Sequence, residues 1–111
     1  SIIKQIEAEV DKLTTEEEIV YHPDGKTIDY IKIFDSETKK VIKIISYDDD
    51  GKIITSLKEL NPEGKQSKLT FYNSEGKIIE RNNYNSEGKR IEKTNYNSEG
   101  KIIQRIYYNP D

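Results

Sequence analysis

Few residues of this chain have the type and spacing that catalysis needs. The only histidine, His22, precedes Pro23 in a turn-like segment, and the 111 residues contain no cysteine. Without cysteine, a thiolate zinc site and a disulfide framework are both excluded. A serine or threonine nucleophile needs a histidine base and an orienting acid, and one histidine in a turn does not supply that arrangement. We therefore expect His22 to be structural.

Two short motifs resemble ion-binding loops. Asp48-Asp-Asp-Gly51 resembles the start of a calcium loop, but the twelfth position counted from Asp48 is Glu59, which falls in a predicted strand. Gly25-Lys26-Thr27 matches the end of a phosphate-binding loop, yet no glycine stands five residues earlier. Simple turn acids and chance resemblance explain these motifs. We predict no catalytic residue, no metal site and no cofactor.

The C-terminal half offers side chains suited to binding another protein. Arginine and tyrosine are enriched at the energetically dominant positions of protein interfaces. The candidate partner-binding residues are Arg81, Lys93, Arg105, Tyr84, Tyr96, Tyr107 and Tyr108. The alternatives are that the cations are simply solvated and that the tyrosines pack along the border of a sheet.

These candidates lie in a tandem repeat. Three copies begin at Tyr72, Tyr84 and Tyr96, each followed by Asn-Ser-Glu-Gly-Lys, so the repeat has a period of twelve. Earlier copies begin at Tyr21, Phe34, Tyr47 and Leu60, where the period is thirteen. In the copy at Phe34, Thr38 stands where the other copies have glycine.

One repeat unit predicts one tight turn and one strand. Asn or Asp, then Ser or Pro, an acid and Gly are typical of a type I turn closed by a residue with positive φ. The residues between turns are rich in Ile, Tyr and Thr, which favour strands. One turn per strand makes successive strands antiparallel neighbours. We expect a mainly β fold, a single antiparallel meander of about 7–8 strands, in preference to a β-solenoid, whose coils usually need more residues.

The N-terminal segment has a different periodicity. Apolar residues recur there at helical spacing, at Ile2, Ile3, Ile6, Val10 and Leu13. Residues 2–13 are therefore predicted to form an amphipathic helix packed on the early strands. The expected organisation is an N-terminal helical segment over residues 1–18 and a repeat meander over residues 19–111, together one domain.

Counting from the turns predicts the cross-strand neighbours. The expected border rows are Tyr72–Ile78–Tyr96–Ile102 and Gln66–Tyr84–Arg90–Tyr108. The same count gives a middle row Leu69–Arg81–Lys93–Arg105. Like charges directly opposite each other destabilise a sheet, so this row indicates either an open, solvated face or a face that binds an acidic partner surface. Because one extra residue per unit would turn later side chains to the other face, we also predict a β-bulge in each strand of the half with the longer period.

The composition limits the classes of function. Only 32% of residues are hydrophobic and 35% are charged, which suits a thin sheet better than a thick core. The formal net charge of -3 disfavours a dedicated nucleic-acid binder. No apolar run approaches the length that crosses a bilayer, and no signal peptide is present in the sequence. We expect no nucleic acid and no membrane as partners.

The run Tyr21-His-Pro-Asp-Gly-Lys-Thr-Ile-Asp-Tyr-Ile31, with Phe34-Asp-Ser-Glu-Thr-Lys-Lys-Val-Ile42 after it, resembles the repeat module of a domain of unknown function in phytoplasma proteins. More loosely, residues 20–111 resemble the variant MORN repeats of bacterial antitoxin-like proteins. The first resemblance implies a small secreted effector that acts inside host cells by binding a host protein. We therefore expect a non-enzymatic, protein-binding module. The alternatives are a self-assembling structural protein whose edge strands pair between copies, and an antitoxin-like immunity partner.

Overall fold

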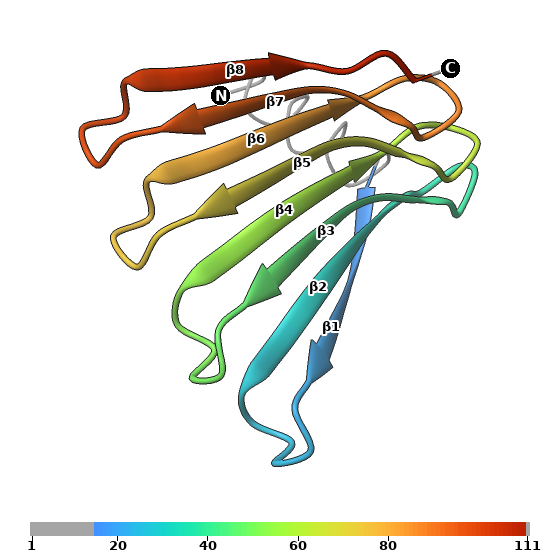
Figure 1. Cartoon of the computed structure of the whole chain (residues 1–111). Coiled ribbons are helices and arrows are strands. Elements are labelled where there is room, and N and C mark those ends of the chain that lie inside the picture. Colours follow the sequence, from blue (N-terminus) through green and yellow to red (C-terminus); the bar gives the residue numbers. More distant parts are fainter. Residues whose placement is uncertain (1–14, 111) are drawn as a thin grey trace, which may run out of the picture.

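The computed structural model describes residues 15–110, which form one antiparallel sheet with the strand order β1-β2-β3-β4-β5-β6-β7-β8 (Figure 1). Each strand pairs with its neighbours in sequence, so the sheet is a simple meander. The strands are β1 Thr15–Tyr21, β2 Ile28–Asp35, β3 Val41–Tyr47, β4 Ile54–Leu60, β5 Gln66–Tyr72, β6 Ile78–Tyr84, β7 Arg90–Tyr96 and β8 Ile102–Tyr107. The predicted meander is therefore confirmed.

The expected fold needs one correction, because no helix is present within residues 15–110 and the described structure is all β. Thr15 to Glu18, assigned above to the N-terminal helical segment, belong to strand β1. Pairing with β2 places Glu17 opposite Ile33 and Glu18 opposite Lys32, so this ladder overrides the weak strand propensity of the glutamates. The helix predicted over residues 2–13 lies outside the described residues.

Six of the seven turns have a glycine with positive φ, as the repeat predicted. In the turn at Asn73, its Oδ1 accepts hydrogen bonds from the backbone N–H groups of Glu75 and Lys77, at 2.9 and 3.0 Å. The Gly76 N–H donates to the Asn73 carbonyl. The asparagine side chain thus satisfies the donors that the tight turn leaves without a ladder partner.

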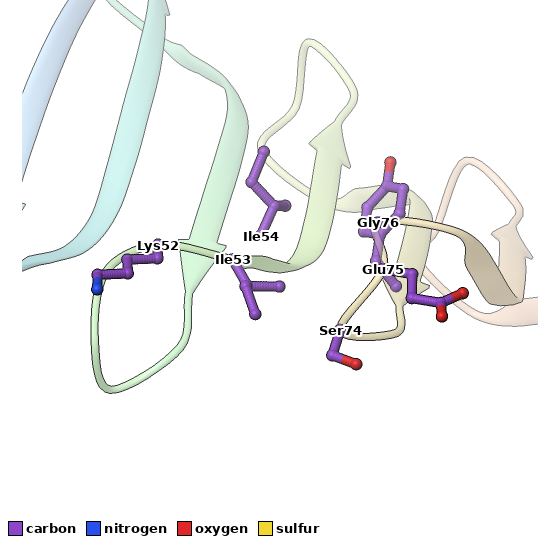
Figure 2. Close-up of a pocket in the computed structure, with 7 residues that line it drawn as sticks. Lys52, Ile53, Ile54, Ser74, Glu75 and Gly76 are labelled. Carbon is purple, nitrogen blue, oxygen red and sulfur yellow. The ribbon is translucent and has the colours of Figure 1, made fainter.

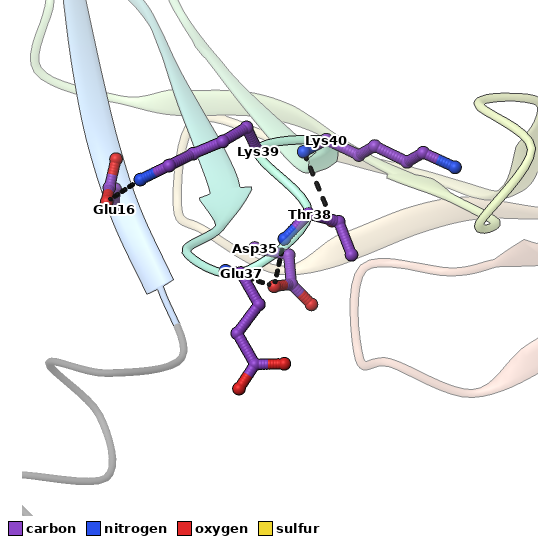
Figure 3. Close-up of polar contacts among 6 residues, drawn as sticks. All are labelled: Glu16, Asp35, Glu37, Thr38, Lys39 and Lys40. Atoms are coloured by element: carbon purple, nitrogen blue, oxygen red, sulfur yellow. Dashed lines mark hydrogen bonds and ion pairs between the residues drawn. The ribbon is translucent and has the colours of Figure 1, made fainter.

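The turn between β2 and β3 departs from this pattern. Lys39, and not Thr38, takes the left-handed conformation, with φ of 61°, and the turn closes between Asp35 and Lys40. Asp35 Oδ1 accepts from the N–H of Glu37, and Lys39 Nζ reaches Glu16 on β1 at 2.6 Å (Figure 3). Like the turns that close between His22 and Thr27 and between Asp48 and Ile53, this turn is one residue longer than the four turns that begin with asparagine. It differs from those two because its left-handed residue is Lys39, one position after Thr38.

Every hairpin contains one register shift near the start of its second strand. In the β5–β6 pair, Tyr72 lies opposite Ile78 but Phe71 lies opposite Glu80, so Ile79 is an extra, bulged residue. The corresponding bulged residues of β2 to β8 are Asp29, Ile42, Thr55, Ser67, Ile79, Ile91 and Ile103. The bulges predicted for the half with the longer period are confirmed, but the other half has them too, so the thirteenth residue of a longer unit is not its bulge. That residue lies in the turn, because Tyr47 pairs with Ile54, seven residues later, whereas Tyr72 pairs with Ile78, six residues later. Bulges increase the local twist, and the sheet is strongly twisted from β1 to β8 (Figure 1).

The sheet has no apolar core among its described residues. No hydrophobic side chain there is fully buried, and the buried residues are the polar Thr70, Asn82 and Thr94, at 2%, 1% and 2% exposure. One central row changes character along the sheet: it runs Ile19–Ile31–Ile45–Leu57–Thr70–Arg81–Thr94–Arg105. The early strands therefore present an apolar stripe, and the late strands continue it with threonine and arginine. The described residues include no helix that is long and apolar enough to cross a membrane.

The hairpin turns also contact one another along each border of the sheet. Lys40 Nζ donates to the carbonyl of Pro62 at 3.0 Å, and Asn61 Nδ2 donates to the carbonyl of Ser86 at 3.1 Å. On the opposite border, Lys77 Nζ donates to the carbonyl of Ser98 at 3.3 Å. Because alternate turns lie on the same border, these bonds join turns two strands apart in sequence.

Candidate binding face

The bulges decide which candidate residues share a face of the sheet. Side chains alternate between faces along a strand, and the register pairs Arg81 with Thr94 and Thr94 with Arg105. Lys93 pairs instead with Asn82 and Ile106. We call the side that carries Arg81 and Arg105 the arginine face, and the side that carries Asn82 and Lys93 the asparagine face.

The predicted row Leu69–Arg81–Lys93–Arg105 is therefore wrong. That row assumed that residues pair one for one from each turn along the whole strand. The bulged residues Ile79, Ile91 and Ile103 each shift the pairing beyond them by one residue. The shift moves Lys93 to the other face. The border pairs lie between the turns and the bulges, so Tyr72–Ile78, Tyr84–Arg90 and Tyr96–Ile102 are confirmed.

On the arginine face, neither arginine has a carboxylate partner among the described residues. Arg81 is half-buried, and its Nε atom is buried without a hydrogen-bond acceptor. Arg105 is exposed. The nearest position with an acid is Glu92, whose Oε1 accepts from Thr94 Oγ1 at 3.0 Å and from Asn83 Nδ2 at 3.4 Å. The described salt bridges of the sheet include neither Arg81 nor Arg105.

On the asparagine face, the charges are joined in one network around Asn82. Its Nδ2 donates to Glu80 Oε2 at 2.9 Å, and its Oδ1 accepts from Arg90 Nη1 at 3.3 Å. Lys93 Nζ lies 3.6 Å from Glu80 Oε1, with both side chains 28% exposed. The Arg90 guanidinium lies over the ring of Tyr108 at 4.3 Å. The polar and charged groups around Asn82 satisfy one another, which gives this network a structural role.

The four candidate tyrosines fall into different environments. Burial raises the pKa of Tyr84, and the carboxylate of Glu80 adds to this while Arg90 opposes it. Tyr108 is stacked under Arg90, and Tyr96 is half-buried beside Ile102. Tyr107 is 69% exposed and lies opposite Glu92, on the arginine face. Packing therefore accounts for the first three tyrosines, and Tyr107 is the one that offers a ring to a partner.

Sequence reasoning missed Asn82, Glu80 and Arg90 as members of a network. A polar side chain at the centre of a strand was the available signal, because Asn82 and Asn83 interrupt the apolar pattern of β6. That signal indicated an unusual strand but could not identify the partners, which depend on the bulged register.

A hollow of about 410 Å³ lies between the β3–β4 and β5–β6 turns (Figure 2). Its lining residues are Lys52, Ile53, Ile54, Tyr72, Ser74, Glu75 and Gly76. In the next pair of turns along this border, Lys77 crosses to the Ser98 carbonyl. Lys52 occupies the equivalent position but makes no such bond to Ser74 in the described structure, so the hollow lies where the turn-to-turn contact is missing.

The turn residues considered for ion binding serve the backbone. Asp48 Oδ1 accepts from the N–H of Lys52 and Ile53, at 3.0 and 3.3 Å. Asp24 accepts from Thr27 Oγ1 and from two backbone N–H groups, and these bonds lower its pKa to about 2. His22 Nδ1 is 3.8 Å from Asp29 Oδ2. Across residues 15–110, no three His, Cys, Asp or Glu side chains are grouped so that they could hold a metal ion.

Comparison with known proteins identifies the repeat. The model of the family described as "Protein of unknown function (DUF2963)" matches three overlapping segments, residues 2–46, 21–67 and 47–95. The second and third segments begin at repeat tyrosines, Tyr21 and Tyr47, which are two repeat units apart. A search of the curated proteins finds no match.

Solved structures share the fold at low sequence identity. A crystal structure of the GtfA/B complex bound to UDP and GlcNAc matches at 16% identity with a TM-score of 0.60, over 84% of this chain and 19% of that chain. A mutant of S. aureus TarM in complex with fondaparinux, alpha-GlcNAc-glycerol and UDP matches at 14% identity with a TM-score of 0.52, over 94% of this chain and 22% of that chain. The chain thus spans about a fifth of the length of these proteins, and the likeness extends to the fold alone.

Proposed function

We propose that this chain, which belongs to the family described as protein of unknown function (DUF2963), is a non-enzymatic repeat module that binds another protein through the C-terminal half of its sheet. The observation that carries the proposal is that residues 15–110 form a single sheet in which no apolar side chain is fully buried. A sheet of this kind leaves broad faces for recognition, as repeat architectures commonly do.

The distribution of exposed residues favours the C-terminal half. Ile103 and Tyr107 of β8 are 64% and 69% exposed, the highest values among the large apolar residues of the described chain. Arg105 lies between them in the same strand and is also exposed. Tyrosine and arginine beside an apolar side chain are the combination enriched at the energetic centres of interfaces.

The finer proposal concerns where the module acts. The residues around Tyr21 and Phe34 resemble phytoplasma repeat modules, and this resemblance supports a secreted effector that binds a host protein inside the host cell. No catalytic or cofactor role is proposed for any residue. In the turns, Asp24 and Asp48 accept hydrogen bonds from backbone N–H groups, and His22 lies beside Asp29.

Affinity capture tests the proposal with matched variants. The immobilised chain is exposed to plant-cell extract, and captured proteins are purified and titrated against it. We expect a saturable partner at micromolar concentration that is lost with the double variant Ile103→Ser and Tyr107→Ser. The control is Ile19→Ser with Tyr21→Ser, which removes the same two residue types from β1, where they are 42% and 47% exposed. Absence of a saturable partner, or equal loss with both variants, would contradict the proposal.

Self-association is the second candidate function, and one observation favours it. Of the seven exposed large hydrophobic residues, five lie in the outer strands of the described sheet: Ile19, Tyr21, Ile102, Ile103 and Tyr107. Exposed outer strands with apolar side chains can pair between copies. Light scattering across a hundredfold range of concentration distinguishes the two functions, because a mass that stays at 12.9 kDa argues against self-association.

A further inference from the structure

We propose that Arg81 and Arg105, here called the arginine pair, bind a carboxylate side chain of the partner protein over Thr94. This inference rests on the proposed protein-binding function and assigns its chemistry: the partner presents an aspartate or glutamate to the arginine face. Lys93, which the sequence grouped with these arginines, has no part in the site.

The register brings the arginine pair to the two sides of one small residue. Arg81 in β6 and Arg105 in β8 both pair with Thr94 in β7. Neighbouring strands are about 4.8 Å apart, so the backbones of the two arginines are about 10 Å apart. Thr94 is 2% exposed, and its short side chain lies between the two arginines. Two long guanidinium side chains that rise on either side of a short threonine can converge on one oxyanion above it.

The arginine pair differs from Lys93 and Arg90, which have interaction partners within the sheet. Lys93 lies 3.6 Å from Glu80, and Arg90 is engaged by Asn82 and Tyr108. The arginine pair has no equivalent partner among the described residues, and Arg81 Nε is buried without an acceptor. A guanidinium without an acidic partner favours a carboxylate, which it can bind through two parallel hydrogen bonds.

The same face explains why the carboxylate belongs to a protein. Tyr107 is two residues from Arg105 in β8 and on the same face, and it is 69% exposed. Towards β1, the row of the arginine pair continues as Leu57, Ile45 and Ile31. A partner segment with an acid flanked by apolar residues would match the arginine pair, the tyrosine ring and the stripe together, whereas a small free anion would engage the arginines alone.

Nitrogen-15 NMR on the full chain tests the proposal by following the side-chain Nε–H signals of the arginines. The probes are poly-L-glutamate, inorganic phosphate and, as the opposite charge, poly-L-lysine. We expect poly-L-glutamate to shift the Arg81 and Arg105 signals while the Arg90 signal stays in place. The double variant Arg81→Gln and Arg105→Gln should weaken poly-L-glutamate binding by about tenfold or more, since hydrogen bonds to charged groups each contribute that much.

The matched control is Lys32→Gln with Lys58→Gln, which removes two positive charges from β2 and β4 on the asparagine face. We expect this control to retain binding within about twofold, as surface charges remote from a site do. Equal weakening by both double variants would show that net charge alone attracts the probe and would overturn the site. Shifts with phosphate but not with poly-L-glutamate would overturn the choice of a carboxylate. If a captured partner binds the Arg81→Gln and Arg105→Gln variant normally, the arginine pair is refuted while the protein-binding function stands.

Discussion

Replacing Gly51 by alanine should destabilise the sheet far more than the same replacement at Gly76. Both glycines have positive φ, at 70° and 81°, and each donates its N–H to the carbonyl of the residue that begins its turn. Left-handed φ costs a residue with a Cβ about 1–2 kcal/mol, and this cost is common to the two variants. The surroundings differ. A Cβ on Gly76 would meet nothing within 4 Å, whereas a Cβ on Gly51 would lie 2.7 Å from Thr27 Cγ2 and 3.0 Å from the backbone nitrogen of Ile28.

The additional cost at Gly51 comes from overpacking between two turns. Forcing a methyl group into occupied space typically costs about 1–3 kcal/mol. We therefore expect Gly76→Ala to lose about 1–2 kcal/mol and Gly51→Ala about 2–5 kcal/mol of the free energy of unfolding. In melting temperature, each kcal/mol corresponds to about 4–8 °C for a domain of this size.

Urea denaturation followed by tyrosine fluorescence and circular dichroism measures the difference, because the chain has eight tyrosines and no tryptophan. A rescue variant identifies the cause: Thr27→Ser removes Cγ2 but keeps the Oγ1 that donates to Asp24. In the Gly51→Ala background it should restore part of the lost stability, with the remainder due to the Ile28 backbone. Equal losses for the two alanine variants, or no rescue by Thr27→Ser, would refute the packing of the first turn against the third.

Three further measurements test individual contacts. The folded-state pKa of Asp24 is lowered from 3.8 to about 2, so its contribution to stability is present above about pH 4 and is lost as the pH falls towards 2; Asp24→Asn should flatten that part of the urea-midpoint profile. Asn85→Ala removes the acceptor of two exposed turn N–H groups and should cost about 1 kcal/mol, whereas Asn85→Asp should stay within about 0.5 kcal/mol. A double-mutant cycle with Glu80→Gln and Lys93→Gln should give a coupling of about 0.5–1 kcal/mol, which falls with salt, and a value near zero would show that the pair is solvated.

The repeat made the meander and its turns predictable from the sequence. Each glycine after an acid marks a position that needs positive φ, and one turn per strand allows only a short list of topologies. The border pairs beside the turns were also predictable, because Tyr84 and Arg90 are counted directly from the turn that joins them. The conformation of the turn at Thr38 was not predictable, because turns of the same length at His22 and Asp48 keep the left-handed residue at the glycine, whereas here it moves to Lys39.

The bulges do not change the repeat length, because units of both lengths contain one, so the period could not reveal them. The extra residue of a longer unit lies in its turn, between paired residues such as Tyr47 and Ile54. The bulged Ile79 and Ile91 have the same residue type as other strand positions, so nothing in the sequence marks them. The burial of Asn82 follows from the register that these bulges set, so its network with Glu80 could not be derived first. Long-range pairing likewise decided that the glutamates of β1 form a strand.

One consequence of the bulges governs any binding surface on this sheet. Arg81, Lys93 and Arg105 occupy equivalent positions in consecutive repeats. The shift in the β6–β7 hairpin moves Lys93 to the asparagine face, and the shift in the β7–β8 hairpin returns Arg105 to the arginine face. Equivalent residues therefore alternate between faces, and the repeat that a partner meets on one face spans two units of the sequence repeat. Substitutions that alter recognition should consequently fall at matching positions of every second repeat, while the same positions of the intervening repeats tolerate change on the other face.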